Sequence, residues 1–235
     1  MEKIIVLYYY HLLPNNCFEK LQYAIFPQLH TLKFMRGFPE DEELTKFLEN
    51  NGRSLEKLYF EDSYLNDSLN FLNLAIAKFC PNLKSLYTAF VNNEHGSEML
   101  KVILNNCQQL ESIKILYDDY NYFEYYEDED LICLNEEELL EIVAKYSPKS
   151  FYKLKIIYGC GAPSKISSEK LESFFINWMN RIPQKPLSFI IVDSSYYSKS
   201  LVIKKENIEV IEKYIKLGVI KKFKIKDVQY INDKK

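Results

Sequence analysis

The sequence predicts an α/β fold built as a solenoid, in which short strands alternate with helices along one open array. Two observations predict this fold. One six-residue motif recurs along the chain, with apolar residues at its first, fourth and sixth positions. A helical pattern of apolar residues follows most copies of this motif. Because a single strand–helix unit cannot bury its apolar side alone, neighbouring units are expected to stack around a shared core.

The recurring motif appears in seven copies whose first positions are 26, 28, 27, 41, 36 and 33 residues apart. A degenerate copy, Ile4-Leu7-Tyr9, precedes them. The seven copies are Leu29-Leu32-Phe34, Leu55-Leu58-Phe60, Leu83-Leu86-Thr88, Leu110-Ile113-Ile115, Phe151-Leu154-Ile156, Leu187-Ile190-Val192 and Ile220-Phe223-Ile225. A period of roughly 20–30 residues with this spelling is typical of a leucine-rich repeat. We therefore expect a horseshoe of seven to eight strand–helix repeats of irregular length.

Helical patterns lie between the motif copies, at residues 40–50, 69–79, 97–106, 135–146, 168–181 and 206–217. Ser97 and Asn135 are suited to cap two of these helices, and Gly218 is suited to end the last. A doubly wound sheet would also alternate strands with helices, but its strands are apolar on both faces. The gaps inside each motif are polar instead, as in LEKLYF at residues 55–60, which favours the solenoid.

The composition predicts one domain over residues 1–235 and excludes several classes of protein. The formal net charge of −3 gives no bias toward nucleic acid. There is no apolar stretch of about 18 residues, so no membrane span is expected. The tyrosine-rich start is a poor signal peptide, which favours the cytoplasm, with the nucleus also open. Cys80 and Cys107 each stand three residues before a motif copy, where a thiol serves as a small buried apolar group.

The variable positions inside the motif should form the concave face of the array and hold the binding site. Nine of these twenty-one positions are lysine and two are glutamate. The candidate protein-binding residues are Lys33, Lys57, Tyr59, Lys84, Tyr87, Lys114, Tyr152, Lys153 and Lys155, and the remaining lysines are Lys221, Lys222 and Lys224. This pattern predicts a surface for an acidic or phosphorylated protein segment. The alternative is that the lysines only keep an exposed sheet from pairing with other chains.

An acidic, tyrosine-rich insertion at residues 117–134 explains the 41-residue spacing between two motif copies. Residues 118–138 contain ten acidic side chains and no basic one. The insertion is expected either to be a solvated surface loop or to fold toward the basic face and compete with an acidic partner.

The sequence offers no arrangement of residues for catalysis, and we expect a monomeric, non-catalytic protein without a metal or cofactor. His11, His30 and His95 lie in different repeats, and neither serine nor cysteine stands in a nucleophile motif. The CxxC spacing that many metal sites use is also missing.

Three stretches carry a resemblance to a known family: FPQLHTL at 26–32, FCPNLKSL at 79–86 and NCQQLESI at 106–113. They resemble the cysteine-containing leucine-rich repeats of F-box proteins. The sequence, rich in isoleucine, tyrosine and asparagine, is similar to those of expanded fungal F-box families. The resemblance implies the substrate receptor of an SCF-type ubiquitin ligase, which docks on the Skp adaptor and cullin through an F-box. The sequence shows no F-box ahead of the repeats. The chain is therefore expected to be the repeat half of a longer protein, truncated at its N-terminus, or a stand-alone interaction or inhibitor protein.

Overall fold

A computed structural model describes residues 3–8, 16–35, 39–61, 68–90, 96–117, 134–158, 164, 166–182, 185–193 and 204–227. Strands and helices alternate through these residues. The strands are β1 (Lys3–Tyr8), β2 (Leu29–Met35), β3 (Lys57–Glu61), β4 (Ser85–Ala89), β5 (Ser112–Tyr117), β6 (Lys153–Tyr158), β7 (Leu187–Asp193) and β8 (Ile220–Asp227). The helices are α1 (Asn16–Leu21), α2 (Asp41–Asn51), the 3-10 turn η1 (Gly52–Ser54), α3 (Ser68–Phe79), α4 (Gly96–Asn106), α5 (Glu136–Tyr146), α6 (Ser168–Met179) and α7 (Lys205–Lys216).

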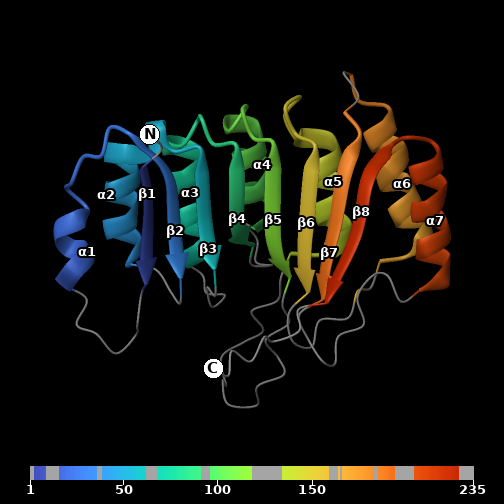
Figure 1. Ribbon diagram of the computed structural model, residues 1–235, viewed down its shortest axis with the longest axis horizontal. Helices are drawn as coiled ribbons and strands as arrows, with labels where there is room; N and C mark the ends of the chain where they lie inside the picture. The colour runs from blue at the N-terminus through green and yellow to red at the C-terminus, as the bar shows by residue number, and fades with distance from the viewer. Residues whose placement is uncertain are drawn as a thin grey trace, which may run out of the picture.

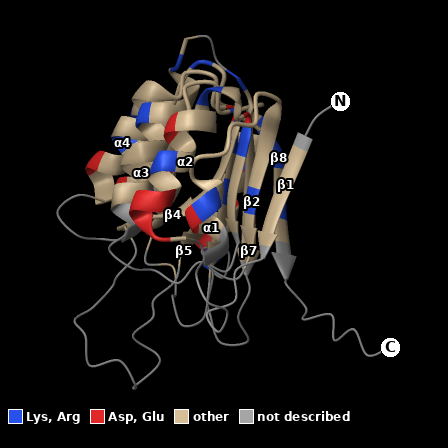
Figure 2. Ribbon diagram, turned by 90° about the vertical axis from the view of Figure 1, so that its left-hand side faces the viewer, with Lys and Arg blue, Asp and Glu red and all other residues tan. Residues whose placement is uncertain are grey.

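All eight strands form one sheet in which each strand pairs in parallel with the next strand along the chain (Figure 1). The sheet is not closed, because β1 and β8 stand at opposite ends of this order. Figure 2 shows the helices stacked against one side of the sheet. From α2 to α7, each α-helix packs on the next one in the chain. The sequence prediction of alternating strands and helices in one open α/β array is therefore confirmed.

The core lies between the sheet and the helices and is built from the recurring motif. A fully buried leucine side chain contributes about 1.5–3 kcal/mol relative to an exposed one, so the repeated leucines are a main source of stability. The motif leucines whose side chains are 0% exposed are Leu29, Leu32, Leu55, Leu58, Leu83, Leu86, Leu110, Leu154 and Leu187. Cys80 and Cys107 are also fully buried, as predicted, and the Cys107 thiol donates to the Cys80 carbonyl oxygen at 3.4 Å.

The helices begin and end close to the predicted positions where local signals are strong. Asn135 caps α5, as predicted, because its side chain accepts hydrogen bonds from the amides of Glu137 and Glu138. Gly218 follows α7 with a φ of +75°, a conformation that suits glycine. The prediction that Ser97 caps α4 is wrong, since that helix already begins at Gly96.

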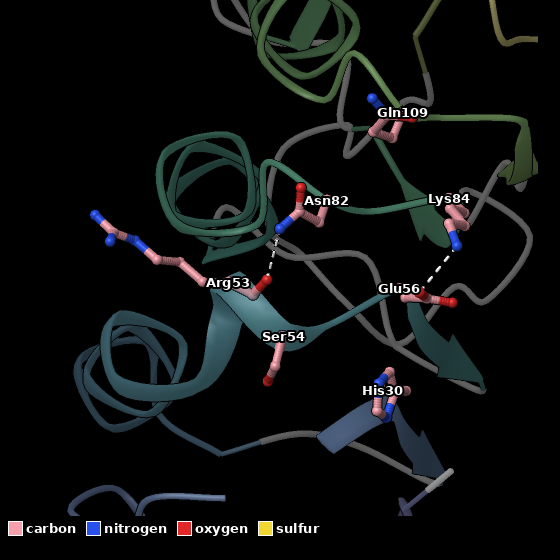
Figure 3. Close-up of a pocket in the computed structure, with 7 residues that line it drawn as sticks. All are labelled: His30, Arg53, Ser54, Glu56, Asn82, Lys84 and Gln109. Atoms are coloured by element: carbon pink, nitrogen blue, oxygen red, sulfur yellow. Dashed lines mark hydrogen bonds and ion pairs between the residues drawn. The ribbon is translucent and has the colours of Figure 1, made fainter. Parts of the chain in front are cut away.

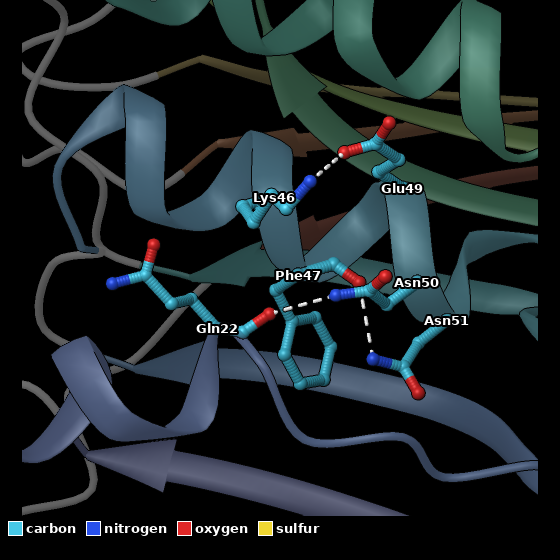
Figure 4. Close-up of polar contacts among 6 residues, drawn as sticks. All are labelled: Gln22, Lys46, Phe47, Glu49, Asn50 and Asn51. Atoms are coloured by element: carbon cyan, nitrogen blue, oxygen red, sulfur yellow. Dashed lines mark hydrogen bonds and ion pairs between the residues drawn. The ribbon is translucent and has the colours of Figure 1, made fainter.

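Asn51 fixes the segment between α1 and β2 against the end of α2. Its side-chain amide donates to the carbonyl oxygens of Ala24 (2.8 Å) and Phe47 (3.1 Å), and its oxygen accepts from the amide of Phe26 (2.6 Å). Beside it, Asn50 donates to the Gln22 carbonyl at 3.1 Å (Figure 4). The buried asparagine satisfies the Ala24 carbonyl and the Phe26 amide, which lie outside helices and strands, so this connection keeps one conformation.

Two motif copies differ from the predicted register at their fourth and sixth positions, the β7 copy by one residue and the β1 copy by two. In β1, Ile5 and Leu7 pair with the core residues Leu32 and Phe34, whereas Ile4 is 60% exposed. In β7, the core residues are Phe189 and Ile191, so the Leu187-Ile190-Val192 spelling is wrong. Both strands carry apolar residues at neighbouring positions, and a one-residue shift reverses which side chains face the core.

Gly52 lies against the end of α3 in the next repeat, and alanine there is expected to lower stability. An added Cβ atom would lie 2.6 Å from the Phe79 carbonyl oxygen and 3.0 Å from the Cys80 sulfur. Because the closest contact is with backbone, relief requires a shift of α3. We expect Gly52→Ala to reduce the free energy of unfolding by about 1–3 kcal/mol, as for other overpacked sites. Urea denaturation measures this loss, and Arg53→Ala at the exposed neighbouring position is the control; equal stabilities of the two variants would contradict the prediction.

Candidate protein-binding face

The side chains that alternate with the core residues form ordered rows on the face of the sheet opposite the helices. Side chains at matching positions of neighbouring strands lie side by side, because the strands pair in parallel. The first row is Thr31, Lys57, Ser85, Ser112, Lys153, Ser188 and Lys222. The second row is Val6, Lys33, Tyr59, Tyr87, Lys114, Lys155, Ile190 and Lys224. We call these two rows the lysine–tyrosine face.

The structure brings seven of the nine predicted site residues into these two rows. They are Lys33, Lys57, Tyr59, Tyr87, Lys114, Lys153 and Lys155. The other two, Lys84 and Tyr152, directly precede β4 and β6 and so lie at the edge where the strands begin. Tyr152 is 40% exposed there. The predicted residues therefore form one continuous surface with a border along the amino ends of the strands.

The lysine–tyrosine face contains an apolar cluster that sequence reasoning missed. Tyr87, Ile157, Ile190 and Val192 are buried and pack together, with Tyr59 and Leu116 against them. Ile157 and Val192 belong to a third row, next to the lysines of the second. The sequence does contain a sign of this cluster: β6 and β7 each include consecutive apolar residues, which place apolar side chains on both faces of the strand. The lysines of the face therefore surround a packed, buried apolar cluster.

Contacts within the face hold several of its side chains in place. The Lys114 ammonium lies 3.4 Å from the centre of the Tyr87 ring, a cation–π contact worth about 0.5–1 kcal/mol at an exposed site. The Tyr59 hydroxyl donates to Ser85 at 3.4 Å, and the Ser112 hydroxyl donates to Ser85 at 2.9 Å. These contacts tie β3, β4 and β5 together on this side of the sheet.

The edge where β2 to β5 begin carries mixed charge instead. Lys84 donates to Glu56 at 2.8 Å, and this bond holds the pKa of the Glu56 carboxyl below its usual value. Both side chains are partly exposed, so the pair contributes little to stability. A shallow pocket of about 300 Å³ lies here, as Figure 3 shows. It is lined by His30, Arg53, Ser54, Glu56, Asn82, Lys84 and Gln109.

The strands β6, β7 and β8 form the most basic part of the face. The described charged side chains of these three strands are Lys153, Lys155, Lys221, Lys222 and Lys224, whereas those of Asp193, Lys226 and Asp227 on the same strands lie outside the described part. The three described lysines of β8 are exposed. Lysines in both rows give this end of the face a positive charge.

Two kinds of chemistry can be assessed among the described residues, metal binding and the reactivity of two thiols. Among them, no three histidine, cysteine, aspartate or glutamate side chains are grouped so that they could hold a metal ion. Burial raises the pKa of the Cys107 thiol to about 12, and it raises that of Cys80 further. Thiols with such pKa values stay protonated at neutral pH, which leaves them poor nucleophiles. No helix in the described part of the chain is long and apolar enough to cross a membrane.

The acidic insertion predicted at 117–134 falls largely outside the described residues. The structure describes Tyr117, which ends β5, and Leu134, which precedes α5, whereas 118–133 are not described. The Leu134 amide donates to the Phe90 carbonyl at 3.0 Å, so the chain rejoins the array beside the end of β4. Whether this segment competes with a ligand stays a prediction.

Comparisons with known proteins identify no family for this chain. No family model matches this chain, and no curated protein matches its sequence. Its architecture is a parallel β/α repeat: eight parallel strands form one open sheet, and helices alternate with the strands along the chain.

Proposed function

We propose that this chain is a non-catalytic protein-binding module whose lysine–tyrosine face captures an acidic segment of another protein. The observation that carries this proposal is the collection of seven predicted lysines and tyrosines in two neighbouring rows, beside an apolar cluster. Lysines supply attraction and orientation for carboxylates, whereas the partly exposed Tyr59 and Tyr152 supply contact area. Interfaces commonly combine these two kinds of contact.

We further propose that the array is a leucine-rich-repeat horseshoe. The support is the motif itself: its leucines point to the core in consecutive strands, and the strand order follows the chain. Doubly wound sheets carry helices on both faces, whereas the described helices here gather on one. Long arrays of this type use the strand side to bind other macromolecules.

The pathway proposed for this module is substrate recognition for an SCF-type ubiquitin ligase. It rests on the resemblance of residues 26–32, 79–86 and 106–113 to F-box protein repeats. The second candidate is a stand-alone interaction or inhibitor protein with no link to a ligase. A C-terminal tag at the native locus separates the two. A captured mass well above 27.9 kDa, together with the Skp adaptor, supports the receptor, whereas a mass near 27.9 kDa without adaptor supports the stand-alone protein.

The binding proposal predicts selective capture of acidic peptides. We expect a displayed library of random peptides, selected on the full chain, to become enriched in aspartate and glutamate. Reversal of Lys33, Lys57, Lys114 and Lys155 to glutamate is expected to weaken binding of the selected peptides at least tenfold, because four attractive charges become repulsive. Binding to the unaltered chain should also weaken as salt is added, since salt screens exposed charges. Fluorescence anisotropy with labelled peptides measures both effects.

The matched control reverses four lysines on the helical side: Lys46, Lys78, Lys145 and Lys170. It changes the net charge of the protein by the same amount but leaves the lysine–tyrosine face intact. Equal losses of affinity in the two variants would show that only net charge matters, and unchanged affinity in the first variant would overturn the proposed function.

A further inference from the structure

The two edge strands of the sheet differ in the side chains that they present. In the described part of the chain, β1 and β8 each pair with one neighbouring strand, so one side of each keeps backbone groups that a further strand can bond. Opposite the helices, β1 presents Ile4 and Val6 in the same two rows in which β8 presents Lys222 and Lys224. Ile4 is 60% exposed and Val6 is 41% exposed. The β1 edge is therefore apolar, whereas the β8 edge is charged.

The end of the array at β1 carries further apolar side chains that are accessible to water. On the helix side of β1, Ile5 and Leu7 are only partly buried against the core. Tyr23 and Ile25, in the connection from α1 to β2 at the same end of the array, are 66% and 69% exposed. Exposed lysines protect an edge strand such as β8 from pairing with other chains. An edge of β-branched apolar residues invites such pairing instead.

We propose that two copies of this chain form a dimer by antiparallel pairing of their β1 strands, in place of the monomer expected from the sequence. A two-fold axis normal to the sheet makes the two strands antiparallel and brings the same surface of each copy into contact. The helices of both copies then lie on one side of a continuous sheet. The occupant of the β1 edge is therefore a second copy of β1 itself.

The register centred on Ile5 covers both exposed side chains of β1. Directly opposite residues of an antiparallel pair lie on the same face, with Cβ atoms about 4.5–5.5 Å apart. In this register, Ile4 of each copy lies opposite Val6 of the other copy. Ile5 lies opposite its own counterpart on the helix side, where the two ends of the core meet. Pairs of β-branched apolar residues stabilise neighbouring strands in this arrangement.

The other ways of joining two copies through their sheet edges are less favourable. Two β8 strands paired in the same way about Phe223 would place Lys222 opposite Lys224 twice, and like charges directly opposite destabilise a sheet. Joining β8 of one copy to β1 of the next would set these lysines beside the apolar side chains of β1. That arrangement is also open-ended and builds a fibre rather than a closed dimer. Symmetric pairing of β1 covers the apolar edge and brings no lysine pair together.

The dimer leaves the lysine–tyrosine face accessible, because the second copy adds to the edge of the sheet. Both lysine–tyrosine faces lie on the same side of the continuous sheet. The inference goes beyond the proposed function and does not depend on it. A failure of the dimer therefore leaves the proposed capture of acidic segments untouched.

The first test is the native mass of the full chain by sedimentation velocity at micromolar concentration. We expect twice 27.9 kDa for the unaltered chain. The variant Ile4→Lys with Val6→Lys gives β1 the same two charges as β8, and it should dimerise at least tenfold more weakly. The matched control is Ile176→Lys with Met179→Lys on α6, which adds the same charge at residues that are 41% and 39% exposed. The control should dimerise as the unaltered chain does.

The second test mixes two variants and examines the register. Ile4→Glu with Val6→Glu should also be monomeric alone. An equimolar mixture with the lysine variant should regain the mass of a dimer, because position 4 of one copy faces position 6 of the other and opposite charges then meet. Circular dichroism shows whether each variant is folded.

Three results would overturn the inference. One is an unaltered chain that stays monomeric over the micromolar range, which would leave β1 for a strand of another protein. The others are equal weakening by the α6 control and a mixture of the folded charge variants that stays monomeric.

Discussion

Replacing Trp178 with alanine is expected to lower the free energy of unfolding by about 3–5 kcal/mol, the range for large aromatic side chains in a core. Trp178 is 1% exposed, and its ring centre lies 6.0 Å from that of Phe151 and 6.1 Å from that of Phe174. Its indole nitrogen also donates to the Lys185 carbonyl at 2.9 Å. Truncation would leave a cavity between α6 and the sheet and an unpaired carbonyl.

The loss should extend beyond the cavity because Trp178 supports a second group of contacts. The Arg181 guanidinium lies 4.2 Å from the centre of the indole ring. From there it donates to the Ser147 carbonyl at 2.6 Å and to the Pro148 carbonyl at 3.0 Å, just after α5. Without the ring, the guanidinium loses the surface that orients it toward these carbonyl groups. The aromatic side chain therefore joins two successive repeats.

Urea denaturation measures this effect. Circular dichroism is used to follow it, because the variant lacks the only tryptophan of the chain and therefore its fluorescence signal. Met179→Ala is the matched control: it changes the next residue, which is 39% exposed. Its expected cost is within about 0.5 kcal/mol, as for most surface substitutions. Similar midpoints for the two variants would contradict the proposed role of Trp178.

Replacing Glu136 with alanine is expected to cost about 3 kcal/mol, since it leaves two buried hydroxyl groups without their acceptor. Glu136 lies in the first turn of α5 and is only 3% exposed. Tyr158 donates to its carboxyl group, and Ser164 donates to both of its oxygens at 2.9 and 2.7 Å. Burial, and next the adjacent Glu136, raise the pKa of Tyr158, so its phenol keeps the donated proton.

The control for this variant is Glu137→Ala, one residue along the same helix. Glu137 is partly exposed, and its carboxylate lies 3.5 Å from the Lys170 ammonium. Both variants remove one acidic side chain from the first turn of α5, so the difference between them isolates the buried contacts. Glu136→Gln keeps one acceptor oxygen and should fall between wild type and Glu136→Ala in urea denaturation. A Glu136→Ala protein as stable as Glu137→Ala would show that the buried hydroxyl groups find other acceptors.

Much of the fold was predictable because the motif leucines and helix caps act locally. Leu55 and Leu58 identify a strand by spacing alone, and Asn135 identifies the start of α5 by its capping chemistry. Helix α1 has six residues and no long apolar pattern, so periodicity could not identify it. In β7, four apolar residues in a row fit either register. Pairing with β6 selects the register that points Phe189 inward.

Part of the candidate site was likewise predictable from the sequence, and part was not. Alternation within the motif predicts that Lys33 and Lys155 point away from the core, and parallel pairing then places both in one row. The apolar cluster around Ile190 could not be predicted, because it depends on which face each residue of β7 occupies. The Lys84–Glu56 pair depends on contacts between side chains 28 residues apart.

The sequence by itself determined the repeating unit, the buried leucines of that unit and the abundance of lysine between them, because these follow from spacing and residue type within a few residues. Only the tertiary structure decided the register of β1 and β7 and the apolar cluster beside the lysines. Each of these depends on how one strand pairs with the next, and a shift of one residue in pairing exchanges the two faces of a strand.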